Sequence, residues 1–136
     1  MARISEEQFV VKTSPNSAAG AEVAFTAAQN LLVKTFHVAL VTDANAANRQ
    51  VHFTFEDAAG NVYARFVAGG THAASLTRQY AGRPGEFAAP AVADTAFIIP
   101  IPNGGIYLPN GGKIKTVTTA IQVGDDYGVL TVSARY

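Results

Sequence analysis

Apolar and polar side chains alternate with a period of two through the middle of the chain. Residues 49–56 place apolar side chains on one face and polar ones on the other: Val51, Phe53 and Phe55 against His52 and Thr54. This alternation is typical of a strand with one buried face. The turn-forming residues 57–61 follow, and residues 62–67 again have strand-like content. The pattern therefore predicts a β-hairpin.

The preceding segment carries two competing signals. Residues 21–32 are rich in alanine and suit a helix by propensity, yet Val23 and Phe25 also alternate with their neighbours as in a strand. Residues 31–42 alternate more clearly, with Phe36 and the apolar residues after it on one face. We therefore expect a strand, a short break and a second strand.

Glycine and proline divide the region that follows. Residues 72–80 predict a further strand, which the glycines and the proline of residues 82–85 are expected to close. Residues 86–94 are rich in alanine and proline and predict a loop. Residues 95–102 are apolar, but their prolines lack an amide hydrogen, so we expect them at a strand end or a sheet edge.

The C-terminal third has two β-rich runs, joined at residues 124–128. In the first run, the residues expected to share a face are Val117, Ile121 and Val123, with Thr119 among them. In the second run, the residues expected to share a face are Leu130, Val132, Ala134 and Tyr136. Because this run continues to the last residue, we expect the C-terminus to be tied into a sheet.

Together these elements predict an all-β chain, folded as an antiparallel β-sandwich or jelly roll of about eight strands. Residues 1–20 have strand-like content only at residues 9–11 and then pass through turn and linker residues. We interpret them as an extended N-terminal arm, with a disordered leader as the alternative. Residues 21–136 then form a single domain, which agrees with the chain length.

Composition excludes several function classes. Only 15% of the residues are charged and the formal net charge is zero, so the basic excess of a nucleic-acid binder is missing and no such partner is expected. The same balance opposes self-association only weakly. The lack of cysteine excludes disulfides, thiolate metal sites and cysteine nucleophiles. A polar N-terminus and the lack of a long apolar run predict a soluble cytosolic product with no signal peptide and no membrane partner.

No catalytic or metal-binding signature stands out. The histidines lack the close spacing of a double-stranded β-helix metal site, and we interpret His37 and His52 as solvent-facing or interface residues. Asp125 and Asp126 lack the neighbouring oxygen ligands that calcium needs, so a hairpin turn is the better interpretation. A hydrolase with two distant carboxylates stays open. We therefore predict no catalytic residue, no metal and no cofactor.

One apolar, proline-stiffened stretch is a candidate contact surface. It comprises residues 97–102 and 107–109, close to predicted loops. Core packing is the ordinary interpretation, and a contact between subunits is the sharper hypothesis, because large exposed apolar patches usually mark interfaces. The candidate partner-binding residues of this stretch are Phe97, Ile99, Ile101 and Tyr107.

Three segments resemble a group of small tailed-bacteriophage virion proteins with a jelly-roll-like fold. Residues 42–61 carry the pattern Ala-Asn-Arg-x-Val followed by Asp-x-x-Gly-Asn, and residues 74–80 form the second segment. Residues 106–132 resemble the Leu-Pro-x-Gly and Gly-Asp ending of those proteins. No functional residue of the family transfers to this chain, because such proteins work through surfaces.

The resemblance implies a structural role. It points to a capsid decoration (cement) protein on the virion surface, which binds the assembled major capsid protein, often as a homotrimer at local symmetry axes. The alternative location in the virion is the head–tail connection or the tail. In the arm, we expect Phe9, Val10 and Val11 to be apolar anchors. A carbohydrate-binding jelly-roll module is the runner-up, and an enzyme of the double-stranded β-helix class ranks third.

Overall fold

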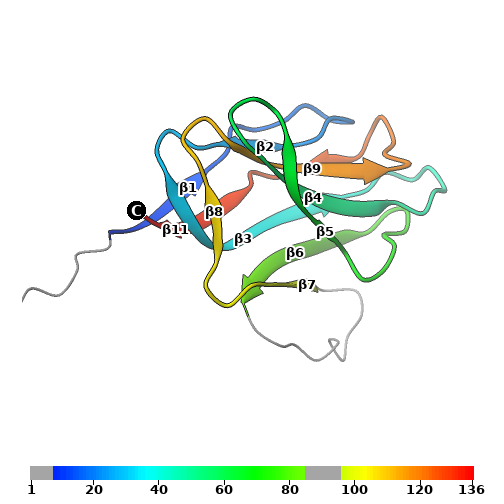
Figure 1. Cartoon of the computed structure of the whole chain (residues 1–136). Helices are drawn as coiled ribbons and strands as arrows, with labels where there is room; N and C mark the ends of the chain where they lie inside the picture. The colour runs from blue at the N-terminus through cyan, green and yellow to red at the C-terminus, as the bar shows by residue number, and fades with distance from the viewer. Residues whose placement is uncertain (1–7, 85–95) are drawn as a thin grey trace, which may run out of the picture.

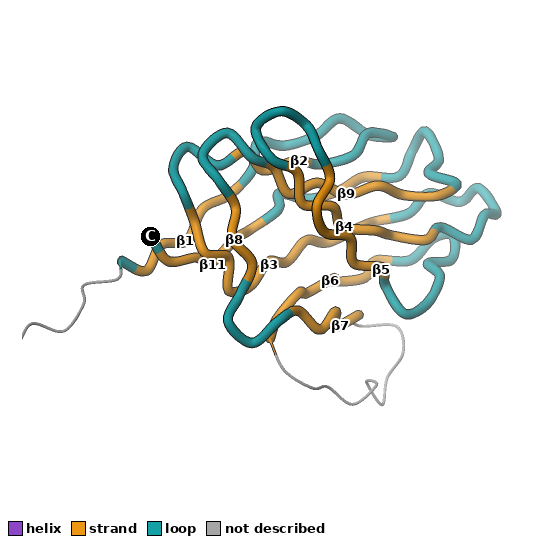
Figure 2. The backbone as a smooth tube through the Cα atoms, viewed as in Figure 1, coloured by secondary structure: helices purple, strands orange, loops and turns teal. Residues whose placement is uncertain are grey.

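Two β-sheets pack face to face as a sandwich (Figures 1 and 2). The computed structural model describes residues 8–84 and 96–136. All regular secondary structure in these residues is β-strand, and they contain no helix that could cross a membrane. The predicted all-β sandwich is thus confirmed.

The larger sheet has seven strands, in the order β1-β11-β3-β6-β7, and β8 and β10 also pair with β3. The strands of this sheet are β1 (Phe9–Thr13), β3 (Leu31–Val41), β6 (Thr77–Pro84), β7 (Ala96–Ile101), β8 (Ile106–Leu108), β10 (Asp126–Tyr127) and β11 (Thr131–Arg135). The smaller sheet has four strands in the order β2-β9-β4-β5. These are β2 (Ala24–Thr26), β9 (Lys113–Thr119), β4 (Gln50–Glu56) and β5 (Val62–Val67).

Strand β3 organises the larger sheet because it is 11 residues long and pairs with four other strands. Its first residues lie between β11 on one edge and β8 on the other. Its last residues lie between β10 and β6. The C-terminal strand, its neighbour β1 and the short strand β8 therefore gather around one end of β3 (Figure 1).

An aromatic cluster fills the space between the sheets. The ring of Phe36 on β3 lies 4.8 Å from that of Phe53 and 5.9 Å from that of Phe55, both on β4. Tyr80 on β6 lies 6.3 Å from Phe53. All four side chains are buried, and their tilted or edge-on contacts are the arrangements that aromatic rings prefer. The apolar face of residues 49–56 thus packs in the core, and Thr54 and Glu56 on the other face of β4 are buried as well.

Several predicted elements are confirmed. β2 and β3 form the strand, break and strand expected from residues 21–42, and β4 and β5 form the predicted hairpin. β7 contains Pro100 and lies at an edge of the larger sheet. The last residue is tied in, because Tyr136 and Gln8 exchange backbone hydrogen bonds of 3.2 and 3.3 Å.

The strand expected at residues 72–80 is shifted. β6 begins at Thr77, because His72 forms only an isolated bridge with Arg49 and Ser75 has a φ of 54°, which interrupts an extended chain. Gly82 does not close the strand but lies inside it. A Cβ at this position would lie 2.2 Å from the Phe36 ring, so the glycine makes room for that ring. The predicted loop 86–94 lies outside the described residues.

The strand number and one pairing also differ from expectation. Residues 8–84 and 96–136 form eleven strands rather than about eight, because short strands such as β8 and β10 hold too few residues to show an alternation. Among these described strands, all pairs are antiparallel except β6 and β7, which run parallel.

The residues expected to share a face in this run do not form the buried face of β9. Val117 and Thr119 point outward, and the strand buries its other face: Ile114, Thr116 and Thr118. The strand ends at Thr119, and Val123 beyond it is 82% exposed. Threonine is tolerated on the buried face because the hydroxyls of Thr116 and Thr118 each donate a 2.8 Å hydrogen bond to the carboxylate of Glu22.

The part of the predicted N-terminal arm that the structure describes is tied to the domain. Residues 9–13 form edge strand β1, which pairs with β11. The amide of Ser14 donates to the carbonyl of Leu130 at 2.8 Å, and that of Gly20 donates to the carbonyl of Asp125 at 2.6 Å. Residues 1–7 lie outside the described residues. Residues 9–20 are therefore held against the domain by these contacts and do not extend away from it as a free arm.

Candidate interaction surface

The apolar residues of β1 lie on two different faces of the larger sheet. Phe9 and Val11 point outward, and each is 61% exposed. Val10 points inward, beside the buried Ala134 of β11, and is itself partly buried. The period of two along a strand explains this division. Of the three predicted anchors, Phe9 and Val11 are therefore presented to solvent, and Val10 packs against the core.

Strand register brings Tyr107 onto the same outer face. Phe9 lies opposite Arg135, Arg135 opposite Leu32, and Leu32 opposite Tyr107. These four side chains form a row across β1, β11, β3 and β8. Tyr107 is 55% exposed. We call the apolar residues of this surface, Phe9, Val11, Leu32 and Tyr107, the terminal-strand face.

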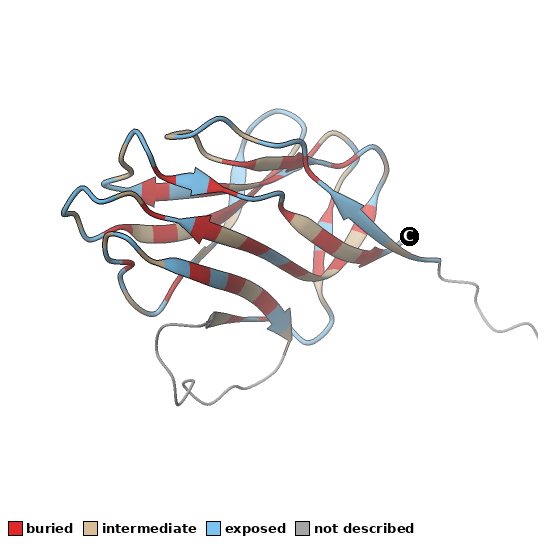
Figure 3. Cartoon of the chain, turned by 180° about the vertical axis from the view of Figure 1, so that it is seen from behind, coloured by how far each residue is buried: buried red, intermediate tan, exposed pale blue. Residues whose placement is uncertain are grey.

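Hydrogen bonds hold the terminal-strand face in place from both sides. The hydroxyls of Thr35 and Ser133 pair between β3 and β11, next to Val11 on β1. At the far side, the hydroxyl of Tyr63 on β5 donates to the carbonyl of Tyr107. Seen from behind, β1 is the exposed strand beside the chain end (Figure 3). Apolar side chains are thus displayed here on a hydrogen-bonded sheet rather than on a loop.

The other predicted partner-binding residues do not reach this surface. Ile99 and Ile101 on β7 are core residues, so a surface contact through them is wrong for the folded chain. The alternation along β7 turns these two side chains inward and turns Pro100 outward. Phe97 is partly buried, with its ring 5.4 Å from that of Tyr80 and the Arg78 guanidinium 4.5 Å from its centroid.

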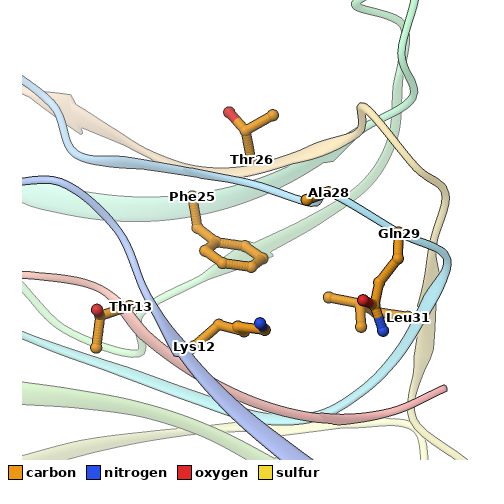
Figure 4. A pocket seen from close by; sticks show the side chains of 7 residues that line it. All are labelled: Lys12, Thr13, Phe25, Thr26, Ala28, Gln29 and Leu31. Atoms are coloured by element: carbon orange, nitrogen blue, oxygen red, sulfur yellow. The ribbon is translucent and has the colours of Figure 1, made fainter.

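A small pocket opens beside β1 on the inner side of the larger sheet (Figure 4). Its volume is about 190 Å³, and its lining includes Lys12 and Thr13 of β1 with Phe25 and Thr26 of β2. Ligand pockets usually have volumes of about 300–1,000 Å³, so this one suits a single side chain better than a cofactor. It lies where the edges of the two sheets meet.

At the opposite end of the sandwich, a buried ion pair joins loops that are distant in sequence. The Arg49 guanidinium donates from Nε and Nη2 to the two carboxylate oxygens of Asp125, both at 2.9 Å, and from Nη2 to Asp43 at 2.8 Å. Arg49 and Asp125 are completely buried. We call Arg49, Asp43 and Asp125 the loop clamp, because they tie the β3–β4 loop to the β9–β10 turn.

The loop clamp changes the interpretation of Asp125. Burial alone would raise the pKa of its carboxyl group, but hydrogen bonds from Arg49 and from the amides of Gln122 and Asp43 hold that pKa below its usual value. Every oxygen of this carboxylate is thus engaged by the protein. Among the described residues there is no group of three or more acidic or histidine side chains placed to hold a metal ion. Asp125 therefore lies in a turn, but not in the predicted hairpin: Asp126 begins β10, and the turn joins strands of different sheets. Asp125 also belongs to a structural ion pair that was not predicted.

His72 is a second buried polar residue whose role the sequence did not indicate. Its Nδ1 atom lies 2.9 Å from the Tyr80 hydroxyl, and its Nε2 atom lies 2.7 Å from the Leu76 carbonyl oxygen. A carbonyl only accepts, so Nε2 carries the hydrogen and Nδ1 accepts from Tyr80. Burial lowers the pKa of His72, which keeps the ring neutral. The other histidines, His37 and His52, are exposed and partly exposed, on outer sheet faces.

In comparisons with known proteins, no family model, no curated protein and no solved structure matched this chain. Arg49 lies in residues 42–61 and Asp125 in residues 106–132, two of the three segments singled out in the sequence, and the fold brings the two side chains into contact. These parts of the motifs thus have a structural role in this chain.

Proposed function

We propose that this chain is a non-enzymatic structural protein of a bacteriophage virion, a capsid decoration protein that binds the assembled major capsid protein. The observation that carries the binding role is the terminal-strand face, where Phe9, Val11 and Tyr107 are exposed together on one sheet. The bacteriophage and capsid parts of the proposal rest on the resemblance of residues 42–61, 74–80 and 106–132 to virion proteins.

Physical chemistry favours this face as a docking site. Aromatic side chains are enriched in protein interfaces, because they bury a large apolar area and lose little conformational entropy on binding. The terminal-strand face combines Phe9 and Tyr107 with two aliphatic side chains, and a sheet that is already hydrogen-bonded needs little reordering to bind. On a shell that repeats the same binding site, weak contacts of this kind add through avidity when several copies are linked.

Co-sedimentation with undecorated capsids tests the proposal. Phe9→Ser and Tyr107→Ser each remove an exposed aromatic side chain, and Val123→Ser is the matched control, because Val123 is 82% exposed on the β9–β10 turn. Loss of an interface anchor costs about 2 kcal/mol or more, so each aromatic variant should bind about 30-fold more weakly while the control binds normally.

Other outcomes would change the assignment. Equal capsid binding by all three variants would exclude the terminal-strand face as the docking site. Specific binding on a glycan array without any capsid binding would favour the carbohydrate-binding alternative. Recovery of the protein with purified tails rather than with heads would favour a role as a head–tail or tail component.

A further inference from the structure

The outer edge of β1 has backbone groups that face away from the sheet. Gln8 exchanges hydrogen bonds with Tyr136, and the amide of Ser14 donates to the carbonyl of Leu130. An antiparallel ladder alternates, so Gln8, Val10, Lys12 and Ser14 direct their backbone groups toward β11. Phe9, Val11 and Thr13 therefore direct their N–H and C=O groups to the other edge. Within the described residues, no strand pairs with that edge.

The other sheet edges in the described part of the chain have features that discourage pairing. β2 is only three residues long. β7 contains Pro100, which cannot donate a backbone hydrogen bond. β5 joins its neighbour through an irregular register and carries the exposed Arg65. Short length, proline, bulges and charge are the devices by which proteins protect sheet edges. β1 has neither proline nor an irregular register, and its one charged residue, Lys12, lies on the inner face, whereas Phe9, Val11 and Thr13 are exposed on the outer face.

We propose that the β1 edge pairs with the β1 edge of a second copy of this chain, antiparallel about a two-fold axis at Val11. In this register Val11 lies opposite Val11 of the partner subunit, and Phe9 lies opposite Thr13 of the partner subunit. The outward-facing backbone N–H and C=O groups of Phe9, Val11 and Thr13 then form hydrogen bonds with the same groups of the second copy. The two larger sheets become one continuous sheet.

The sequence of β1 is self-complementary in this register. Lys12 lies opposite Val10 of the partner subunit, so the two lysines do not face each other directly, and like charges opposite one another would be unfavourable. The pocket lined by Lys12 and Phe25 opens on the inner side of this edge, beside the position that β1 of the partner subunit would take. The zero formal net charge of the chain adds little repulsion between copies.

Pairing also joins two terminal-strand faces. Phe9 and Val11 of the two copies would lie on one outer surface, with the apolar area doubled across the axis. A symmetric, isologous contact is the commonest way in which identical chains associate. This two-fold pair differs from the trimer that the sequence resemblance implies, so the oligomeric state separates them. It also forms without a capsid, and its test is independent of the proposed function.

Single-cysteine cross-linking gives a direct test, because the chain has no cysteine. Directly opposite residues of an antiparallel pair have Cα atoms about 5.5 Å apart, within the range that a disulfide spans. Val11→Cys should therefore form a disulfide-linked dimer under mild oxidation. Val67→Cys is the matched control, because Val67 is also an exposed edge-strand valine, at 48% exposure on β5, and it should stay largely monomeric.

Light scattering of the unmodified protein should give twice the chain mass of 14.2 kDa. Val11→Pro should shift it to the monomer mass, since the proline removes only an amide that faces the free edge, whereas Val11→Ala should stay dimeric. If Val11→Pro fails to fold, the comparison of cross-linking by Val11→Cys and Val67→Cys still tests the proposal. A monomeric or trimeric unmodified protein, or equal cross-linking by Val11→Cys and Val67→Cys, would overturn the proposal.

Discussion

Arg49 and Asp125 are 76 positions apart in the sequence and form a two-pronged ion pair that is completely buried. The guanidinium is also held by Asp43 and by the carbonyl of Ala47. A buried pair of this kind stabilises a fold little compared with an apolar pair of the same shape, but removal of one partner leaves an uncompensated buried charge. The contact therefore determines how the loops at this end are joined.

Removal of the arginine should be strongly destabilising. Arg49→Ala leaves the carboxylates of Asp125 and Asp43 without their cation, so we expect the free energy of unfolding to fall by about 3–5 kcal/mol. Urea denaturation measures this change. Lys34→Ala is the control, because Lys34 donates to the carbonyl of Gly104 at 3.0 Å in an exposed hydrogen bond, and its loss should change the free energy of unfolding by less than about 1 kcal/mol. Similar losses for both variants would contradict the structural importance of the loop clamp.

The pH dependence of stability should report on His72. The pKa of this ring is lowered in the folded chain by burial and by the nearby Arg78 and Arg49, from an unfolded value of 6.5. The unfolded chain then binds the proton more readily, so the free energy of unfolding should decrease as the pH falls below about 6.5. Above that pH the contribution of His72 to stability is fully present.

Chemical denaturation between about pH 5 and 7 measures this slope. His72→Asn should flatten it, even if the variant is less stable at every pH, because the titrating group is gone. The matched control is His37→Asn, which removes a histidine from the exposed face of β3 and keeps His72 in place. A slope that disappears only in the His37 variant would contradict the assignment.

A methyl group at Gly82 should disturb the aromatic cluster. The added Cβ would lie 2.2 Å from the ring of Phe36, which is packed on both sides and has little room to move. Overpacking of this kind costs about 1–3 kcal/mol. Gly104→Ala is the control, because nothing lies within 4 Å of its Cβ position, and its effect should stay within about 0.5 kcal/mol. Thermal or urea unfolding of the two variants gives the comparison.

The register of β9 can be checked by two truncations. Ile114 is completely buried, so Ile114→Ala should lower the free energy of unfolding by about 2–5 kcal/mol. Val123→Ala should change it by less than about 0.5 kcal/mol, because Val123 is mostly exposed. A larger loss for Val123→Ala than for Ile114→Ala in urea unfolding would contradict this register of β9.

Local patterns were sufficient where a strand and its partner lie next to each other in the chain. The hairpin of β4 and β5 follows from alternation on either side of a turn, and Asp57 stabilises that turn by accepting from the amides of Ala59 and Asn61. The edge position of β7 follows from Pro100, because a missing amide hydrogen has the same consequence in any sheet. Both conclusions needed only neighbouring residues.

Contacts between distant residues could not be predicted in this way. The buried face of β9 contains Thr116 and Thr118, and only the approach of Glu22 from another part of the chain satisfies their hydroxyls. Hydrophobicity alone therefore does not identify the buried face of β9. The loop clamp could not be predicted either, because nothing in the sequence indicates that an arginine and an aspartate so far apart will come into contact.

Alternation and turn residues were enough to predict a β-sandwich and to identify apolar residues that are candidates for binding a partner. Which of those residues are exposed follows from the packing of the two sheets. Val11 and Ile99 both lie on edge strands with alternating side chains, yet Val11 is 61% exposed and Ile99 is 3% exposed. The reason is that alternation defines two faces, and only the packing of the second sheet determines which face is covered.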